Sequence, residues 1–368
     1  MRGFVSKRRK SVNNHFFKEN DSASAMEAQY NAQRIAFAPI VFQVARSMRD
    51  LGVLKALYEH KEGLNIEALA NETHLSEYGI TTLLETSLSA DIVKQKGERY
   101  FITKTGYFLL NDPMTIANMN YNHHVNYQGL FSLDEAIKSG KPTGLKVFGE
   151  WETIYPALSI LPENAKASWF TFDHFYSDIA FSEAVEHLLS LNPTNILDVG
   201  GNTGKFAMLL AKSDKSLHVT IMDLSEQLVL ARENIEKAGL SEQISLLPAN
   251  VLAPTHSFPK GFDILWMSQF LDCFSEKEIV SILSKAKEAI SEATTLCIME
   301  PFWDRQRFET SAFCIINTSP YFTAMANGCS KMYHSKDFIK LIERAGLKVE
   351  AISDHLGVCQ SIVKIKKA

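Results

Sequence analysis

The five cysteines of this 368-residue chain contain no C-x-x-C spacing. The sequence therefore predicts neither a zinc site nor a disulfide framework, and we expect most of the thiols to be buried in a reducing cytoplasm. No metal site is expected elsewhere, because the pair His123-His124 has no further partner at ligand spacing.

A strong charge of either sign and long apolar runs are also missing. The formal net charge of −4 argues against nucleic acid as the main partner. No apolar run approaches the 18 residues that a membrane span requires, so no contact with a membrane is expected. Residues 2–10 are basic, but Ser11 to His15 follow where a signal peptide needs an apolar core. Residues 1–25 are therefore predicted to be a disordered basic arm of a cytoplasmic protein.

The most informative stretch runs from Asn195 to Gly204. Its first part is a short apolar run typical of a buried parallel strand, and three glycines follow within five residues. Helical spacing begins again at Lys205. A strand, a tight glycine turn and a helix begin a nucleotide-binding unit, in which the backbone must turn sharply close to a ligand.

An acidic residue about 20 positions beyond the turn strengthens this prediction. Asp223 ends the next apolar segment, where a carboxylate accepts hydrogen bonds from the two hydroxyls of an adenosine ribose. Enzymes that use NAD or S-adenosylmethionine (SAM) share this spacing. The dinucleotide pattern G-x-G-x-x-G fails at Asn202 and Lys205, which disfavours an NAD(P) oxidoreductase.

The N-terminal part, residues 26–112, is predicted to be a mainly helical winged-helix domain. The segment Ile35 to Ala45 is apolar on nearly every side, so we expect a helix buried on more than one face, most simply against a second subunit. Helices near 66–70 and 76–89 precede two wing strands around Gly97. A DNA-binding regulator is an alternative, but the second helix carries glutamates and no basic residue in residues 76–85.

Residues 113–185 are predicted to be a helical connector rich in aromatic side chains, some of which would line a pocket for a flat substrate. Strands and helices alternate regularly in residues 186–368, which predicts an α/β domain with a doubly wound, mainly parallel sheet. The expected strands include 244–247, 262–267 and 295–299, closed by a pair at 349–352 and 359–365.

The pattern Asp198-x-Gly200-x-Asn202-x-Gly204 resembles the D-x-G-x-G-x-G signature of class I SAM-dependent methyltransferases, with Asn at one glycine position. Over residues 28–365 the chain resembles the small-molecule O-methyltransferase family, which includes plant caffeate and isoflavone enzymes and bacterial phenazine and hydroxyneurosporene enzymes. The resemblance implies a Rossmann-like, seven-stranded SAM domain, a winged-helix dimerisation domain and a homodimer. It also implies SAM as cofactor and an aromatic or polyketide-like acceptor.

The resemblance also implies site residues. The three glycines would face the methionine part of SAM, Asp223 would hold the ribose and Leu224 would pack on the adenine. Asn250 would contact the adenine amino group, while Met267 and Ser268 would end a strand beside the methyl donor. The full expected set for the cofactor is Asp198, Gly200, Gly201, Gly204, Asp223, Leu224, Asn250, Val251, Met267 and Ser268.

The catalytic positions depart from the family. Its His-Asp-Trp tripeptide, with His as the base, is matched here by Asp272-Cys273-Phe274, which leaves Asp272 and Glu300 as titratable candidates. A carboxyl group in a dry pocket has a raised pKa and can act as a base near neutral pH. Transfer to oxygen or to a ring carbon is expected. The alternatives are a SAM-binding enzyme with other chemistry and a winged-helix regulator.

Overall fold

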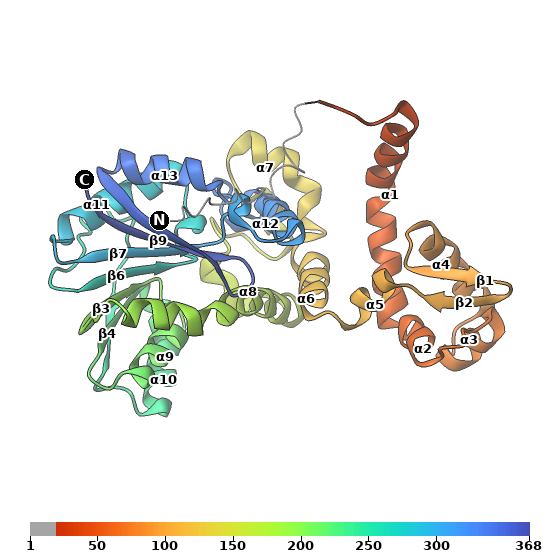
Figure 1. The fold of residues 1–368 in the computed structure, drawn as a ribbon, viewed down its shortest axis with the longest axis horizontal. Helices are drawn as coiled ribbons and strands as arrows, with labels where there is room; N and C mark the ends of the chain where they lie inside the picture. The colour runs from red at the N-terminus through yellow and green to blue at the C-terminus, as the bar shows by residue number, and fades with distance from the viewer. Residues whose placement is uncertain (1–19) are drawn as a thin grey trace, which may run out of the picture. The chain divides into compact units, whose positions relative to one another are not determined.

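The computed structural model describes residues 20–368, which divide into two compact units, residues 20–123 and residues 124–368 (Figure 1). Most of the predicted basic arm therefore lies outside the described residues. Within residues 20–368, no helix combines the length and the apolar character needed to cross a membrane.

The N-terminal unit is mainly helical. Its helices at residues 66–73 and 77–89, followed by two strands around Gly97, confirm the winged-helix prediction. Ser76 caps α4 by accepting a hydrogen bond from the Gly79 N–H at 3.1 Å. Strands β1 and β2 pair antiparallel around Gly97. Met119 of α6, a helix expected in the connector, is buried in the same core. The elements are α1 (Ala25–Asp50), α2 (Val53–Glu59), α3 (Ile66–Thr73), α4 (Glu77–Ser89), β1 (Val93–Lys96), β2 (Arg99–Ile102), α5 (Lys104–Asn111) and α6 (Pro113–Tyr121).

Helix α1 begins with a capping box, in which Ser24 and Glu27 satisfy each other's backbone N–H groups. Within a single chain the apolar segment of this helix is not buried on more than one face, so its burial against a second subunit stays a prediction. Ile35 and Phe37 are 76% and 56% exposed, and the buried residues of the helix are Ala45 and Met48. One chain thus leaves a large apolar surface of α1 in contact with solvent.

The C-terminal unit is built on a seven-stranded sheet in the order β5-β4-β3-β6-β7-β9-β8. The first five strands of this order are parallel, whereas β9 runs antiparallel between β7 and β8. The predicted Rossmann-like sheet and closing strand pair are confirmed. The strands are β3 (Asn195–Val199), β4 (His218–Asp223), β5 (Ile244–Pro248), β6 (Ile264–Ser268), β7 (Thr295–Glu300), β8 (Leu347–Leu356) and β9 (Gln360–Lys367).

Helices cover both faces of this sheet, which gives three layers (Figure 1). One apolar cluster joins one face to α8, α9 and α10, and a second joins the other face to α11 and α13. Ser275 and Glu278 form the predicted capping box of α11. The layer helices are α8 (Glu163–Leu189), α9 (Lys205–Ser213), α10 (Ser225–Ala238), α11 (Glu276–Ala289) and α13 (Ser335–Arg344).

The remaining elements of this unit are helices and helical turns, of which those from η2 to η5 lie within residues 113–185, the range of the predicted connector. They include two π-helical turns, η2 and η8. The elements are η2 (Asn122–Asn126), η3 (Gly129–Ser132), α7 (Leu133–Ser139), η4 (Thr143–Val147), η5 (Tyr155–Ile160), η6 (Leu271–Cys273), η7 (Trp303–Arg305), α12 (Glu309–Tyr321) and η8 (Phe322–Ala326).

Candidate cofactor and acceptor site

The glycine turn lies at the carboxyl end of β3, the edge of a parallel sheet where ligands bind in such folds. Gly200 and Gly204 have φ angles of +77° and +78°, which glycine adopts without strain. Asn202 stands where the signature has a glycine. Its φ is +48°, in the left-handed region of backbone conformation, which Asn tolerates well. A Cβ at Gly201 would lie 2.7 Å from Asp198 Oδ2. The turn therefore requires glycine for both its conformation and its packing.

Two carboxyl groups stand beside this turn. Asp198 is 2% exposed, and its Oδ2 has no hydrogen-bond partner. Burial raises the pKa of Asp198 to about 7, and the charge of Asp223 adds to the shift. Asp223 accepts hydrogen bonds from the N–H groups of Asn202 at 2.9 Å and Leu224 at 2.7 Å. Burial still raises its pKa. Each oxygen of Asp223 keeps a lone pair for a ligand hydroxyl.

The other expected cofactor residues lie on three neighbouring strand ends. Leu224 is the residue before α10, and Met267 and Ser268 end β6, with Met267 fully buried. Asn250 is exposed and accepts a hydrogen bond from the Leu252 N–H at 2.9 Å, and Val251 is buried. The orphaned Asp198 oxygen, the glycine cradle and the Asp223 carboxylate together fit a polar nucleoside cofactor such as SAM.

Asp272 lies in η6, just after β6, and is 6% exposed. Burial raises its pKa to about 7, and the negative charge of Asp173 adds to the shift. Its Oδ1 accepts a hydrogen bond from the Cys273 thiol at 3.5 Å. A carboxyl group with this pKa exchanges protons near neutral pH, as a general base must.

Glu300 ends β7 and is 2% exposed. Its Oε1 accepts hydrogen bonds from the N–H groups of Phe270 at 3.1 Å and Leu271 at 2.8 Å, while Oε2 has no partner. Burial, followed by the charge of Asp272, raises its pKa well above the ordinary value. The contacts of Glu300 suit a side chain that holds the loop carrying Asp272.

Substitutions at Glu300 distinguish a structural role, in which it holds the loop that carries Asp272, from an acid–base role. Glu300→Ala leaves two backbone N–H groups without acceptors and should lower the free energy of unfolding by about 2–4 kcal/mol. Glu300→Gln keeps an acceptor oxygen and mimics the neutral acid, so it should stay within about 1 kcal/mol of the wild type. Denaturant melts measure both changes. A Glu300→Gln variant that folds normally but loses turnover would instead assign Glu300 an acid–base role.

Several groups near Asp272 were missed as site residues. The charge of Asp173, on α8, acts on Asp272, and burial raises the pKa of Asp173 itself to about 6. The charge of Asp272 also acts on Tyr155, which is half-buried, and on Tyr321, which is buried. In the sequence, the only signal for Asp173 and Tyr155 was the richness of residues 113–185 in aromatic side chains. Nothing in the spacing of that segment singled out Asp173.

Hydrogen bonds fix the two tyrosines in place. Asn327 Nδ2 donates to Tyr155 Oη at 3.2 Å and to the Cys273 carbonyl at 2.7 Å. Trp169 Nε1 donates to Tyr321 Oη at 2.7 Å. The Cys273 carbonyl, next to Asp272, is thus tied through Asn327 to Tyr155, which precedes the sheet in the chain.

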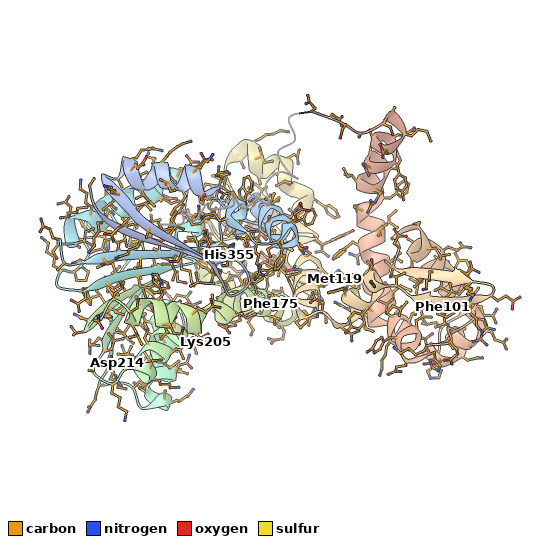
Figure 2. All side chains as sticks on the ribbon, in the orientation of Figure 1. Phe101, Met119, Phe175, Lys205, Asp214 and His355 are labelled. Carbon is orange, nitrogen blue, oxygen red and sulfur yellow. The ribbon has the colours of Figure 1, made fainter. Side chains whose placement is uncertain are left out.

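Lys205 is the first residue of α9 (Figure 2) and forms an ion pair with Asp178 on α8. His174 Nδ1 lies 3.4 Å from the same carboxylate. These contacts join the helix behind the glycine turn to the helix that carries Asp173. Across residues 20–368, no three His, Cys, Asp or Glu side chains come together in a way that would hold a metal ion.

Comparison with protein families gives two matches along the chain. Residues 29–100 match the Dimerisation2-like domain, and residues 196–292 match a methyltransferase domain. The L-tyrosine C(3)-methyltransferase of Streptomyces lavendulae is 23% identical over 320 residues, which is 86% of each chain. The phenazine-1-carboxylate N-methyltransferase of Pseudomonas aeruginosa is 24% identical over 220 residues, or 60% of this chain and 62% of the relative.

Solved structures share the fold across nearly the whole chain. The SAM-dependent methyltransferase SibL superposes with a TM-score of 0.68 at 22% identity, over 91% of this chain and 98% of SibL. The O-methyltransferase NcsB1, in complex with SAM and 2-hydroxy-5-methyl naphthoic acid, gives a TM-score of 0.64 at 17% identity, over 90% of this chain and 96% of NcsB1.

The sheet, the glycine turn and the two domain matches define a class of enzyme that transfers a methyl group from SAM. The chain is a SAM-dependent methyltransferase in which a dimerisation domain precedes the catalytic domain. Its curated relatives transfer methyl groups to carbon, nitrogen or oxygen of aromatic small molecules.

Proposed function

We propose that this enzyme methylates a ring carbon of an aromatic small molecule beside a phenolic hydroxyl, with Asp272 as the base. The observation that carries the proposal is the buried Asp272 carboxyl, with a pKa of about 7, among Tyr155, Tyr321 and Asp173 at the carboxyl edge of the sheet. The relative that acts on L-tyrosine carbon 3 supports transfer to carbon, since it spans 86% of each chain.

SAM supplies an electrophilic methyl group. The chain itself therefore has to bind and orient the donor and the acceptor and to remove a proton from the acceptor. The Asp223 carboxylate and the turn at Gly200–Gly204 would hold the donor. Asp272 would accept the phenolic proton, which raises the electron density on the neighbouring ring carbon. A carbon–carbon bond would then form to this ring carbon as the sulfur–methyl bond of the donor breaks, with the bonding electron pair staying on sulfur. The ring hydrogen would leave as a proton, the ring would become aromatic again, and Asp272 would return its proton to the phenolate oxygen. One proton is released to solvent in each turnover.

Incubation with SAM carrying a ¹³C-labelled methyl group tests the reaction. The acceptors would be L-tyrosine, tyramine, hydroxynaphthoic acids and phenazine-1-carboxylate, with the product followed by carbon NMR. We expect an aryl-methyl signal on a phenolic acceptor. A methoxy signal alone would show that the methyl group is transferred to oxygen instead of carbon. An N-methyl signal alone would contradict the role of the phenol. Labelled SAM that binds but transfers to no phenol would overturn the proposal.

We also propose that the enzyme is a homodimer formed through α1. The match to a Dimerisation2-like domain supports this, as do the exposed side chains of Tyr30, Ile35, Phe37 and Ile40. Single chains that expose such a large apolar surface usually bury it against a partner. Within the chain, we propose that the dimerisation domain ends near residue 112. The helical connector that lines the acceptor pocket would then run to about residue 185.

The double variant Ile35→Glu/Ile40→Glu should be monomeric. Both side chains are exposed in the single chain, at 76% and 54%, so the charges should cost little within the monomer but disrupt an apolar interface. Light scattering at micromolar concentration measures the mass, and circular dichroism checks the fold. Removal of residues 1–19 is the matched control and should leave a dimer. A monomeric wild type would contradict the proposal.

A further inference from the structure

The ring of Phe270 lies directly against the glycine turn. A Cβ added at Gly200 would come within 2.3 Å of Phe270 Cδ2 and 2.9 Å of Cε2. Any residue other than glycine at position 200 would therefore collide with this ring. Phe270 follows β6 by two residues, so its ring connects the end of β6 to the turn that ends β3.

The backbone under this ring is held in an unusual conformation. Gln269 has a φ of +46°, which is costly for a residue with a side chain. Its N–H donates to the Met299 carbonyl at 2.8 Å, and its Oε1 accepts from Gln360 Nε2 at 2.8 Å. Glu300 Oε1 accepts from the Phe270 N–H at 3.1 Å. Strands β7 and β9 thus fix the corner that carries the ring.

The orientation of Gln360 is settled by its partners. Its side-chain nitrogen also donates to the Tyr176 carbonyl at 3.3 Å, and a carbonyl cannot act as donor. Gln360 is fully buried. The ring itself packs edge-on against Phe274, with 4.9 Å between centroids and 69° between planes. The position of Phe270 is therefore set before any ligand arrives.

The same turn attracts positive charge. Asp198 and Asp223 stand beside it, and within residues 20–368 neither forms an ion pair with Lys, Arg or His. SAM carries a sulfonium cation, whereas its product, S-adenosylhomocysteine, is a neutral thioether. The face of an aromatic ring attracts a cation but has no such attraction for a neutral sulfur.

We propose that Phe270 is a donor-binding residue whose ring favours the positively charged SAM over its neutral product. The inference rests on the proposed placement of SAM at the glycine turn. It would give Phe270 a part in product release, since the attraction disappears once the methyl group has left.

Calorimetry with three ligands tests this role without an acceptor. SAM and sinefungin are cationic at the reacting position, and S-adenosylhomocysteine is not. Phe270→Leu should weaken the binding of SAM and sinefungin by about 2- to 30-fold. It should change S-adenosylhomocysteine affinity by less than about twofold, because that ligand loses only packing. Phe270→Tyr keeps the ring and should bind all three ligands like the wild type.

Phe338→Leu is the matched control, because Phe338 is fully buried in the same apolar cluster but packs against Phe302 and Tyr333. It should leave the ratio of SAM to product affinity unchanged. If Phe270→Leu fails to fold, trifluorophenylalanine at position 270 keeps the shape and weakens the attraction for cations. Equal weakening of all three ligands, or none, overturns the inference. A wild type that binds none of the three would instead refute the proposed donor site.

Discussion

Asp272→Asn should lower kcat by about 100- to 10,000-fold while leaving the affinity for SAM nearly unchanged. Asn has the same shape as Asp but cannot accept a proton at neutral pH. The buried position of Asp272 leaves few other groups that could take over, because Glu300 Oε1 already accepts hydrogen bonds from two backbone N–H groups. Steady-state kinetics on the acceptor found in the labelling experiment, with calorimetry for SAM, measures both quantities.

The pH profile gives an independent check of the same role. A base must be deprotonated to act, so kcat should rise with pH through about 7, the pKa of Asp272. The Asn variant should lose this rise. A change confined to the acceptor KM would mean that Asp272 anchors the acceptor. Full turnover by Asp272→Asn would remove Asp272 from the mechanism. Asp272→His should retain activity on a phenol only if the reaction is O-methylation.

Asp223→Ala should weaken SAM binding by about 2–4 kcal/mol, or about 30- to 1,000-fold. The carboxylate is partly buried beside the glycine turn, where charge-assisted hydrogen bonds to two ribose hydroxyls are strong. Calorimetry with SAM measures the loss directly. Unchanged affinity would contradict the assignment of the ribose site.

A control is needed because Asp223 also supports the turn itself, through the N–H groups of Asn202 and Leu224. Asp223→Asn keeps the shape and one acceptor oxygen but loses the charge. It should melt close to the wild type and bind SAM more weakly than the wild type but more tightly than Asp223→Ala. If the two variants lose stability and affinity in proportion, the effect comes from the turn alone.

The geometry on the proposed cofactor side of the site could be predicted because its signals are local in sequence. A strand, three glycines and an acidic residue at the end of the next strand are spaced by the geometry of one βαβ unit. The structure brings Gly200, Gly204 and Asp223 together as that spacing requires. The wing around Gly97 was predicted for the same reason, since a hairpin is also a local structure.

The acceptor side could not be predicted in the same way. Asp173, Tyr155 and Tyr321 lie on helical segments far from Asp272 in the sequence, and only tertiary packing brings these side chains near it. The bond between Gln360 and Gln269 spans 91 positions. The burial of α1 was predicted from composition, but composition does not say which molecule covers an apolar surface. That surface is exposed within one chain.

The position of β9 has a consequence for how the chain folds during synthesis. β9 follows β8 in sequence but lies inside the sheet, between β8 and β7. Until residues 360–367 leave the ribosome, β7 has an open edge that can pair with other chains. Gln360, the residue that fixes the corner before Phe270, arrives with the same strand. The sheet and the proposed donor site are therefore completed by one late event, and we expect a nascent chain that stalls before it to be inactive and prone to aggregate.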